Sequence, residues 1–323
     1  MSASESRLFS RGDLADLLGL VNDNAISRWQ DPAYLLSSDV AWQLPGSRGN
    51  LQLWFDDSGM AAYAWFGLIT PSTLDLRADV GYHSAVAADV LAWLEARRRE
   101  FEPLVPWLIG LKSMQAWEQA LNAGAPLAPG TDTILQVGAF EQDRERIAWL
   151  EANGFAAADH FNYYLARSLD DPIPEPALAE GWCVRAVQEP DFEARVAVHR
   201  DSWHKSSFAL AQYLKVREVA VFDPDLDLVA QAPDGEFASY CIGWVDQATG
   251  VGSFEPVGTP PAWRRRGLGQ QVQYEGLRRM KSKGMHHAKI GTAGFNDRAY
   301  GLYTSCGFKL TDRERTYIKI LNM

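Results

Sequence analysis

Apolar and polar residues alternate in two parts of the chain that resemble each other. Residues 51–67, LQLWFDDSGMAAYAWFG, and residues 226–244, LDLVAQAPDGEFASYCIGW, each contain an alternating stretch, an acidic turn with glycine, and a second alternating stretch. This pattern is typical of a β-hairpin. Residues 144–155 and 297–308 each predict a short helix that ends at Gly-Phe, followed by a strand. The chain is therefore expected to contain two copies of one structural unit, the first one degenerate.

The second copy predicts strands and helices that interleave. Apolar residues at Leu268, Val272, Leu277 and Met280 follow the helical period. The remaining elements follow from similar patterns: strands at 182–187, 252–259, 288–292, 308–310 and 316–321, a hairpin at 226–247, and helices at 191–219, 267–283 and 296–306. We expect a mixed α/β fold of two tandem domains, each a mostly antiparallel β-sheet flanked by α-helices.

A proline-rich segment separates the two patterned regions. Residues 168–181, SLDDPIPEPALAEG, contain three prolines and several acidic residues, as a linker between domains does. A chain of 323 residues is also long enough for two domains. The predicted domains are residues 1–170, which we expect to be non-catalytic, and residues 171–323.

Composition narrows the class of protein. With 47% hydrophobic and 22% charged residues, the chain has ordinary globular usage. The N-terminus lacks the pattern of a signal peptide, and the longest apolar stretch, residues 59–69, is too short to span a membrane, so a cytoplasmic protein is expected. The three cysteines, Cys183, Cys241 and Cys306, fit neither a disulfide framework nor a zinc site, so we expect small buried side chains and no metal.

Charge is distributed unevenly along the chain. The net charge of −10 argues against nucleic acid and anionic lipid as partners. Residues 253–323, however, hold 13 Lys and Arg against 5 Asp and Glu, whereas residues 171–252 hold 6 against 14. The basic segment suggests a local anion site, and the acidic one would favour a cationic ligand.

Residues 253–269, SFEPVGTPPAWRRRGLG, carry the strongest chemical signal. A strand leads into Arg264, Arg265, Arg266, Gly267, Leu268 and Gly269, and then directly into a helix. Glycines let a ligand approach the backbone, the N–H groups of a helix start favour anions, and arginines donate to phosphate oxygens. The run indicates a pyrophosphate site; a basic turn without a ligand is the alternative that these residues alone leave open.

A second motif lies downstream, where Asn296, Ala299, Leu302, Tyr303 and the pair Gly307-Phe308 follow one another on a predicted helix. Together the two motifs resemble those of the GNAT superfamily of acyl-CoA N-acyltransferases, and the resemblance covers residues 180–323. The tandem arrangement is similar to the two-domain, mycothiol synthase-like group of that superfamily.

The resemblance implies a role for each matching residue. Coenzyme A would be bound by the residues Val257, Gly258, Thr259, Arg264, Arg265, Arg266, Gly267, Leu268, Gly269, Gln270, Asn296 and Tyr303. Tyr303 would also be the general acid, and a backbone amide near Val257 to Thr259 would hold the thioester carbonyl. Asn296 could equally cap its helix. Trp203 and His204 are weaker candidates for the acceptor pocket, a core tryptophan beside a surface histidine being the other interpretation.

The catalytic base is predicted to be Glu255. The family's commonest position for a glutamate corresponds to Ser253 here, and Glu255 lies two residues further along, on the same face of the strand. Pro256 cannot donate to a β-ladder, so the strand is expected to part from its neighbour there and leave a slot for the pantetheine arm. In the first copy Leu150 replaces Tyr303 and Asp143 replaces Asn296, and no RxxGxG motif precedes them.

These observations predict an N-acetyltransferase that moves an acetyl group from acetyl-CoA to the primary amine of a small, cationic molecule by direct attack. We expect a monomer or homodimer. Two alternatives remain: a non-catalytic acyl-CoA-binding regulatory module, which Ser253 would favour, and an acetyltransferase that acts on a protein N-terminus or lysine.

Overall fold

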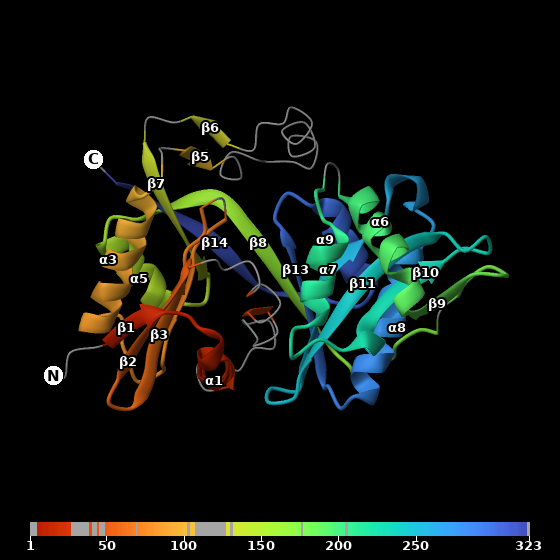
Figure 1. The fold of residues 1–323 in the computed structure, drawn as a ribbon, viewed down its shortest axis with the longest axis horizontal. Coiled ribbons are helices and arrows are strands. Elements are labelled where there is room, and N and C mark those ends of the chain that lie inside the picture. The colour runs from red at the N-terminus through yellow and green to blue at the C-terminus, as the bar shows by residue number, and fades with distance from the viewer. Residues whose placement is uncertain are drawn as a thin grey trace.

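Two lobes lie side by side in the protein, joined by two long strands (Figure 1). The structure is a computed structural model that describes residues 5–321, except residues 27–38, 41–43, 45–48, 69, 102–103, 107–126, 130–131, 176 and 204–205. His204 therefore lies outside the described residues.

The N-terminal lobe is built from a sheet with helices packed on it. Its elements are β1 (Glu5–Leu8), α1 (Leu14–Asn24), β2 (Leu51–Asp56), β3 (Gly59–Trp65), β4 (Thr73–Leu76), α3 (Ala85–Arg99), β5 (Leu104–Pro106), β6 (Leu127–Pro129), β7 (Thr133–Phe140), α5 (Arg144–Ala152) and β8 (Ala156–Ser168).

The C-terminal lobe follows after residues 169–182. Its elements are β9 (Cys183–Ala186), α6 (Phe192–Ser202), α7 (Leu210–Arg217), β10 (Asp227–Gln231), β11 (Phe237–Asp246), β12 (Val251–Gly258), α8 (Leu268–Ser282), β13 (His287–Ala293), α9 (Asp297–Ser305) and β14 (Lys309–Leu321). The hairpins and helices predicted from the alternation and from the helical period are confirmed.

The strands form two main sheets, which confirms the predicted mixed α/β class. One has the order β1-β2-β3-β4, and the other has the order β7-β14-β8-β13-β12-β11-β10-β9. All neighbours in the second sheet are antiparallel except β12 and β13, which are parallel. Helices flank both sheets (Figure 1).

Strands β8 and β14 interleave the two halves of the sequence. β8, from the first half, lies between β13 and β14 of the second, and β14 pairs with β7 and β8. In Figure 1 both strands run from one lobe toward the other. The last strand of residues 171–323 thus lies against strands from residues 1–170. The division at residue 170 stays a prediction.

Two local expectations were wrong. Residues 308–310 and 316–321 do not form separate strands, because β14 is continuous between them. The register of β14 against β8 shifts at two places along this length. Cys183 is exposed on β9 at the edge of the sheet, whereas Cys241 and Cys306 are buried as expected.

Each lobe has its own apolar core. One core joins β3, β4, α3, β7 and α5, and the other joins β10, β11, β12, α8 and α9. None of the helices in the described part of the chain is long and apolar enough to cross a membrane.

Candidate active site

A gap in the sheet opens where the predicted chemistry is concentrated. The parallel strands β12 and β13 pair from Val251 with His287 to Phe254 with Ile290. Beyond that point β13 continues along β8, and β12 continues along β11. The strands therefore diverge after Phe254, which confirms the expectation that β12 leaves its neighbour near Pro256.

Backbone conformation shapes the turn that follows β12. Gly267, the N-cap of α8, has φ +77°, a left-handed conformation that glycine adopts without a Cβ clash. Arg265 has φ +61°, although it is not a glycine. Such a residue is held in place at a cost of about 1–3 kcal/mol and marks functional turns more often than ordinary ones. The first N–H groups of α8 face out of this turn and favour an anion.

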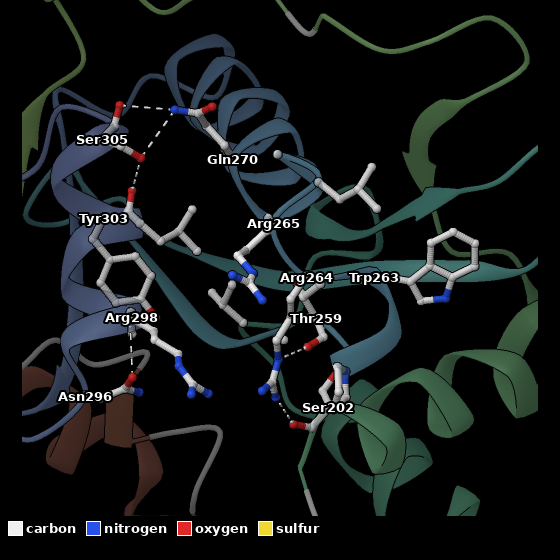
Figure 2. A pocket seen from close by; sticks show the side chains of 18 of the residues that line it. Ser202, Thr259, Trp263, Arg264, Arg265, Gln270, Asn296, Arg298, Tyr303 and Ser305 are labelled. Carbon is white, nitrogen blue, oxygen red and sulfur yellow. Dashed lines mark hydrogen bonds between the residues drawn. The ribbon is translucent and has the colours of Figure 1, made fainter. Parts of the chain in front are cut away.

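The three arginines of this turn have different environments. Arg264 donates from Nε to the Thr259 carbonyl at 3.0 Å and from Nη2 to the Ser202 carbonyl at 3.4 Å, so it fastens β12 to α6 (Figure 2). Arg265 lines the cavity described below, and its side chain points into it in Figure 2. The guanidinium of Arg266 lies 4.7 Å from the centre of the Trp263 ring. Arg266 is not among the residues that line the cavity.

A cavity of about 1080 Å³ lies between this turn, the end of β12 and α9. It brings together most of the residues predicted to bind coenzyme A: Val257, Gly258, Thr259, Arg264, Arg265, Gly267, Leu268, Gly269, Gln270, Asn296 and Tyr303. It is also lined by residues that sequence reasoning missed or ranked low: Asp201, Ser202, Trp203, Pro261, Trp263, Arg298, Ala299, Leu302 and Ser305.

Close packing fixes the end of β12. A Cβ atom at Gly258 would lie 2.4 Å from Cε1 of Tyr240 and 2.8 Å from Cβ of Ser202. Any larger residue there would force Tyr240 or Ser202 to shift, because glycine lets β12 approach both closely. The hydroxyl of Tyr240 also accepts a hydrogen bond from Nε1 of Trp203 at 2.8 Å. Trp203 thus lines the cavity and also packs against the apolar cluster around Tyr240.

Helix α9 carries the second motif. The side chain of Asn296 accepts a hydrogen bond from the Ala299 amide at 3.2 Å, so it caps the helix, as one interpretation expected. Tyr303 lies two turns further along, 7% exposed, on the cavity side (Figure 2). Burial and the nearby charge of Glu255 raise the pKa of Tyr303 well above its usual range. Its hydroxyl therefore keeps its proton at neutral pH and can donate it.

Glu255 is not among the residues that line the cavity. It lies on β12, just past the point where β12 and β13 diverge. The residue is exposed to solvent, yet the protein groups around its carboxyl displace enough water that desolvation raises its pKa to about 7. The charge of Asp39 raises this pKa further, and the charge of Lys289 lowers it. A carboxyl with this pKa is suited to accept a proton near neutrality.

The surroundings of Glu255 are rich in carboxyl groups. Burial raises the pKa of the Tyr164 phenol, and the charges of Glu314, Asp39 and Glu255 raise it further. The Tyr164 hydroxyl donates to Glu314 at 3.2 Å. Lys289, paired with Asp39, is the cation that acts on both Glu255 and Glu314. Three carboxyl groups therefore act on Tyr164, one of which, Asp39, is paired with Lys289.

Weak sequence signals explain the residues that were missed. Trp263 stands directly before the arginine run but belongs to no phosphate-binding pattern. Arg298 follows Asn296 by two positions, and a lone arginine in a first helical turn has no distinguishing spacing. Asp39 lies in the first half of the chain, far from every motif. Among the described residues, no group of three or more His, Cys, Asp or Glu side chains could hold a metal ion.

Diverging parallel strands, a glycine turn into a helix N-terminus and a tyrosine on the facing helix meet at this cavity. Residues 184–308 match the model of the acetyltransferase (GNAT) family, so the chain contains a GNAT acetyltransferase domain. A mycothiol acetyltransferase of Nocardiopsis dassonvillei is 32% identical over 166 residues, which cover 47% of this chain and 50% of that protein. The chain thus matches about half the length of this curated relative.

Solved structures show the same architecture over the whole chain. A tandem GNAT protein from the clavulanic acid biosynthesis pathway has a TM-score of 0.68 at 12% identity, with 99% of both chains covered. A GCN5-related N-acetyltransferase from Sphaerobacter thermophilus has a TM-score of 0.60 at 16% identity and covers 99% of this chain and 96% of its own. The tandem arrangement of the fold therefore has a solved counterpart.

Proposed function

We propose that the protein transfers an acetyl group from acetyl-CoA to the primary amine of a small, cationic molecule. The observation that carries this proposal is the cavity between β12, α8 and α9, in which the glycine turn, Arg265 and Tyr303 meet. Pyrophosphate would lie at the N-terminus of α8, and the pantetheine arm would follow the gap between β12 and β13 toward Glu255.

The residues present can perform each proton transfer of direct attack. Glu255 accepts a proton from the acceptor ammonium, and the freed amine attacks the thioester carbonyl. A new C–N bond forms, and the C–S bond breaks as the tetrahedral intermediate collapses. The Tyr303 hydroxyl, which is protonated at neutral pH, donates its proton to the departing thiolate, and the attacking nitrogen gives up its second proton to restore the Tyr303 hydroxyl. The products are an amide and free coenzyme A.

The charge around Glu255 supports a cationic acceptor. The carboxyl groups of Asp39, Glu255 and Glu314 all act on Tyr164. An ammonium group entering from solvent would be attracted to this region before it loses its proton. A carboxylate-bearing acceptor would be repelled there.

Release of free thiol tests the proposal directly. Purified protein is mixed with acetyl-CoA and a panel of small amines, amino acids and peptides with free N-termini or lysines. Thiol release that depends on a small amine supports the proposal. Release with peptides alone would favour a protein acetyltransferase, and no release with any acceptor would refute acetyl transfer.

A non-catalytic acyl-CoA-binding module is the second candidate. The family's commonest glutamate position holds Ser253 in this chain, so it offers a hydroxyl and no carboxylate. The Ser253 side chain is buried, at 2% exposed. This candidate predicts that acetyl-CoA binds, as measured by calorimetry, although no amine in the panel releases thiol.

A further inference from the structure

A second, smaller cavity lies in the N-terminal lobe. Its volume is about 90 Å³. It is lined by β3, the start of β4, the segment between them and a short stretch before β2: Asp39, Val40, Tyr63, Trp65, Phe66, Gly67, Thr70, Pro71 and Thr73. Apart from Asp39, whose charge acts on Glu255, none of these residues takes part in the proposed transfer of the acetyl group.

Tyr63 gives this cavity a polar group without a protein partner. Its side chain is fully buried, and its hydroxyl has no hydrogen-bond partner among the described residues. A buried hydroxyl left unpaired costs about 1–3 kcal/mol, so such groups normally meet a ligand, a water or another side chain. The cavity lined by Tyr63 and Asp39 offers the place for such a group.

Asp39 connects this cavity to the proposed active site. Its Oδ2 forms an ion pair with Nζ of Lys289, whose side chain is 3% exposed. Lys289 lies on β13 beside Ser253 of β12, two residues before Glu255. The cavity and Glu255 therefore lie on either side of one ion pair that joins the two lobes.

Charge and lining favour a cation in the small cavity. Asp39 borders it directly, and the aromatic residues Tyr63, Trp65 and Phe66 line it. Carboxylates and aromatic rings together are the usual environment of bound ammonium groups. A phenol oxygen adds an acceptor for one N–H donor of such a group.

We propose that the small cavity binds a second ammonium group of the acceptor, whose reacting amine lies at Glu255, so that the acceptor is a diamine. This inference rests on the proposed acetyl transfer. Tyr63 and Asp39 would then determine specificity from the N-terminal lobe, while the chemistry takes place on the C-terminal one.

Matched acceptors test the inference by kinetics. Diamines of increasing length are compared with amino alcohols and alkylamines of equal length in the thiol-release assay. At the best length, we expect the diamine to exceed the alkylamine by at least about 10-fold in kcat/KM, as a buried polar group discriminates against an analogue that leaves it unpaired. Equal kcat/KM for diamine, amino alcohol and alkylamine at every length would overturn the inference and leave acetyl transfer intact.

Tyr63→Phe is the decisive variant, because it removes only the hydroxyl. We expect KM for the diamine to rise roughly 5–10-fold with kcat nearly unchanged, and KM for the alkylamine to stay the same. Tyr317→Phe, which changes a buried tyrosine of β14 outside the cavity, is the control. Equal KM values for Tyr63→Phe and the wild type would overturn the inference. Melting temperatures show that each variant folds.

Binding separates this inference from the proposed function. Calorimetric titration of the best diamine into the protein loaded with coenzyme A requires no acetyl transfer. Binding that Tyr63→Phe weakens would support the cavity even if no thiol were released, in which case only the proposed function fails. No diamine binding to the wild type would overturn the inference.

Discussion

Asp143 and Asn296 occupy equivalent positions at the starts of two equivalent helices. The carboxylate of Asp143 accepts a hydrogen bond from the Arg146 amide at 3.1 Å, and the amide oxygen of Asn296 accepts one from Ala299 at 3.2 Å. Helices α5 and α9 both have nine residues, and a glycine with positive φ follows each, Gly154 and Gly307. The two helices therefore begin with the same kind of cap and end before the same kind of glycine turn.

The two copies differ at the position of the proposed acid. Tyr303 lines the large cavity, whereas its counterpart Leu150 is fully buried in the N-terminal core. Tyr303→Phe should lower kcat by about 10²–10⁴-fold, because proton donation to the thiolate is lost, while acetyl-CoA still binds. Steady-state kinetics and calorimetry check this. Tyr300→Phe, on the same helix but outside the cavity lining, is the control, and unchanged kcat in Tyr303→Phe would exclude Tyr303 as the acid.

Arg265 combines an unfavourable backbone with an exposed guanidinium. Arg265→Gly should raise the free energy of unfolding by about 1 kcal/mol, because glycine adopts the left-handed φ without a Cβ clash. The same change should weaken acetyl-CoA binding by roughly 10–100-fold, since a charge-assisted hydrogen bond contributes about 1.5–3 kcal/mol. Denaturant titration and calorimetry measure the two effects.

The control for Arg265→Gly is Arg278→Ala. Arg278 lies on α8 outside the cavity. Its guanidinium donates hydrogen bonds to the Glu275 carboxylate and to the Pro174 carbonyl. It should leave acetyl-CoA affinity unchanged. Equal affinity of wild type and Arg265→Gly would contradict a phosphate-binding role for this side chain.

The raised pKa of Glu255 predicts the pH dependence of the reaction. A base works when it is deprotonated, so kcat/KM should rise with pH and level off above about 7. Glu255→Gln should remove this limb along with most of the activity. In Lys289→Met the midpoint should move to higher pH, because the charge of Lys289 lowers the pKa of Glu255. A midpoint near roughly 4.3, the ordinary value of a glutamate, would contradict the crowding described for this carboxyl.

The core of the C-terminal lobe depends on a buried ion pair. Asp227 is fully buried and accepts hydrogen bonds from Nε of Arg195 at 2.8 Å and from the Tyr213 hydroxyl. Asp227→Asn would leave the Arg195 charge uncompensated and should lower the free energy of unfolding by about 3–5 kcal/mol. The exposed neighbour Asp225 provides the control, for which Asp225→Asn should cost about 0–1 kcal/mol. Urea denaturation of both variants measures the two free energies of unfolding, and equal losses would contradict the role of the buried pair.

Local signals in the sequence were sufficient for much of the candidate site. The turn at Arg264 to Gly269 and the helix from Asn296 are defined by residues close together in the chain, and the structure brings them to one cavity. The parting of β12 from β13 was predictable from Pro256. The ion pair of Lys289 with Asp39 was not, because 250 positions separate the two residues and no pattern relates them.

Strand exchange between the halves was equally out of reach of local patterns. The runs that follow Phe155 and those at residues 308–310 and 316–321 predict strands, but such patterns do not say which strands become neighbours. Each edge of a sheet pairs with whatever strand the whole fold places beside it. The boundary predicted at residue 170 rests on a change of pattern in the sequence, and such a change does not by itself define a unit that folds alone.

The interleaved strands predict how the two halves behave when separated. In a protein of residues 171–323 alone, β14 would lose both of its neighbours, β7 and β8, and β13 would lose β8. Unpaired edges of this length expose N–H and C=O groups and promote aggregation. Residues 171–323 expressed alone should therefore aggregate or lack a cooperative unfolding transition in calorimetry, whereas adding residues 133–170 as well should restore one. A soluble fragment of residues 171–323 with a sharp transition and full acetyl-CoA affinity would show that the C-terminal half folds independently of β7 and β8.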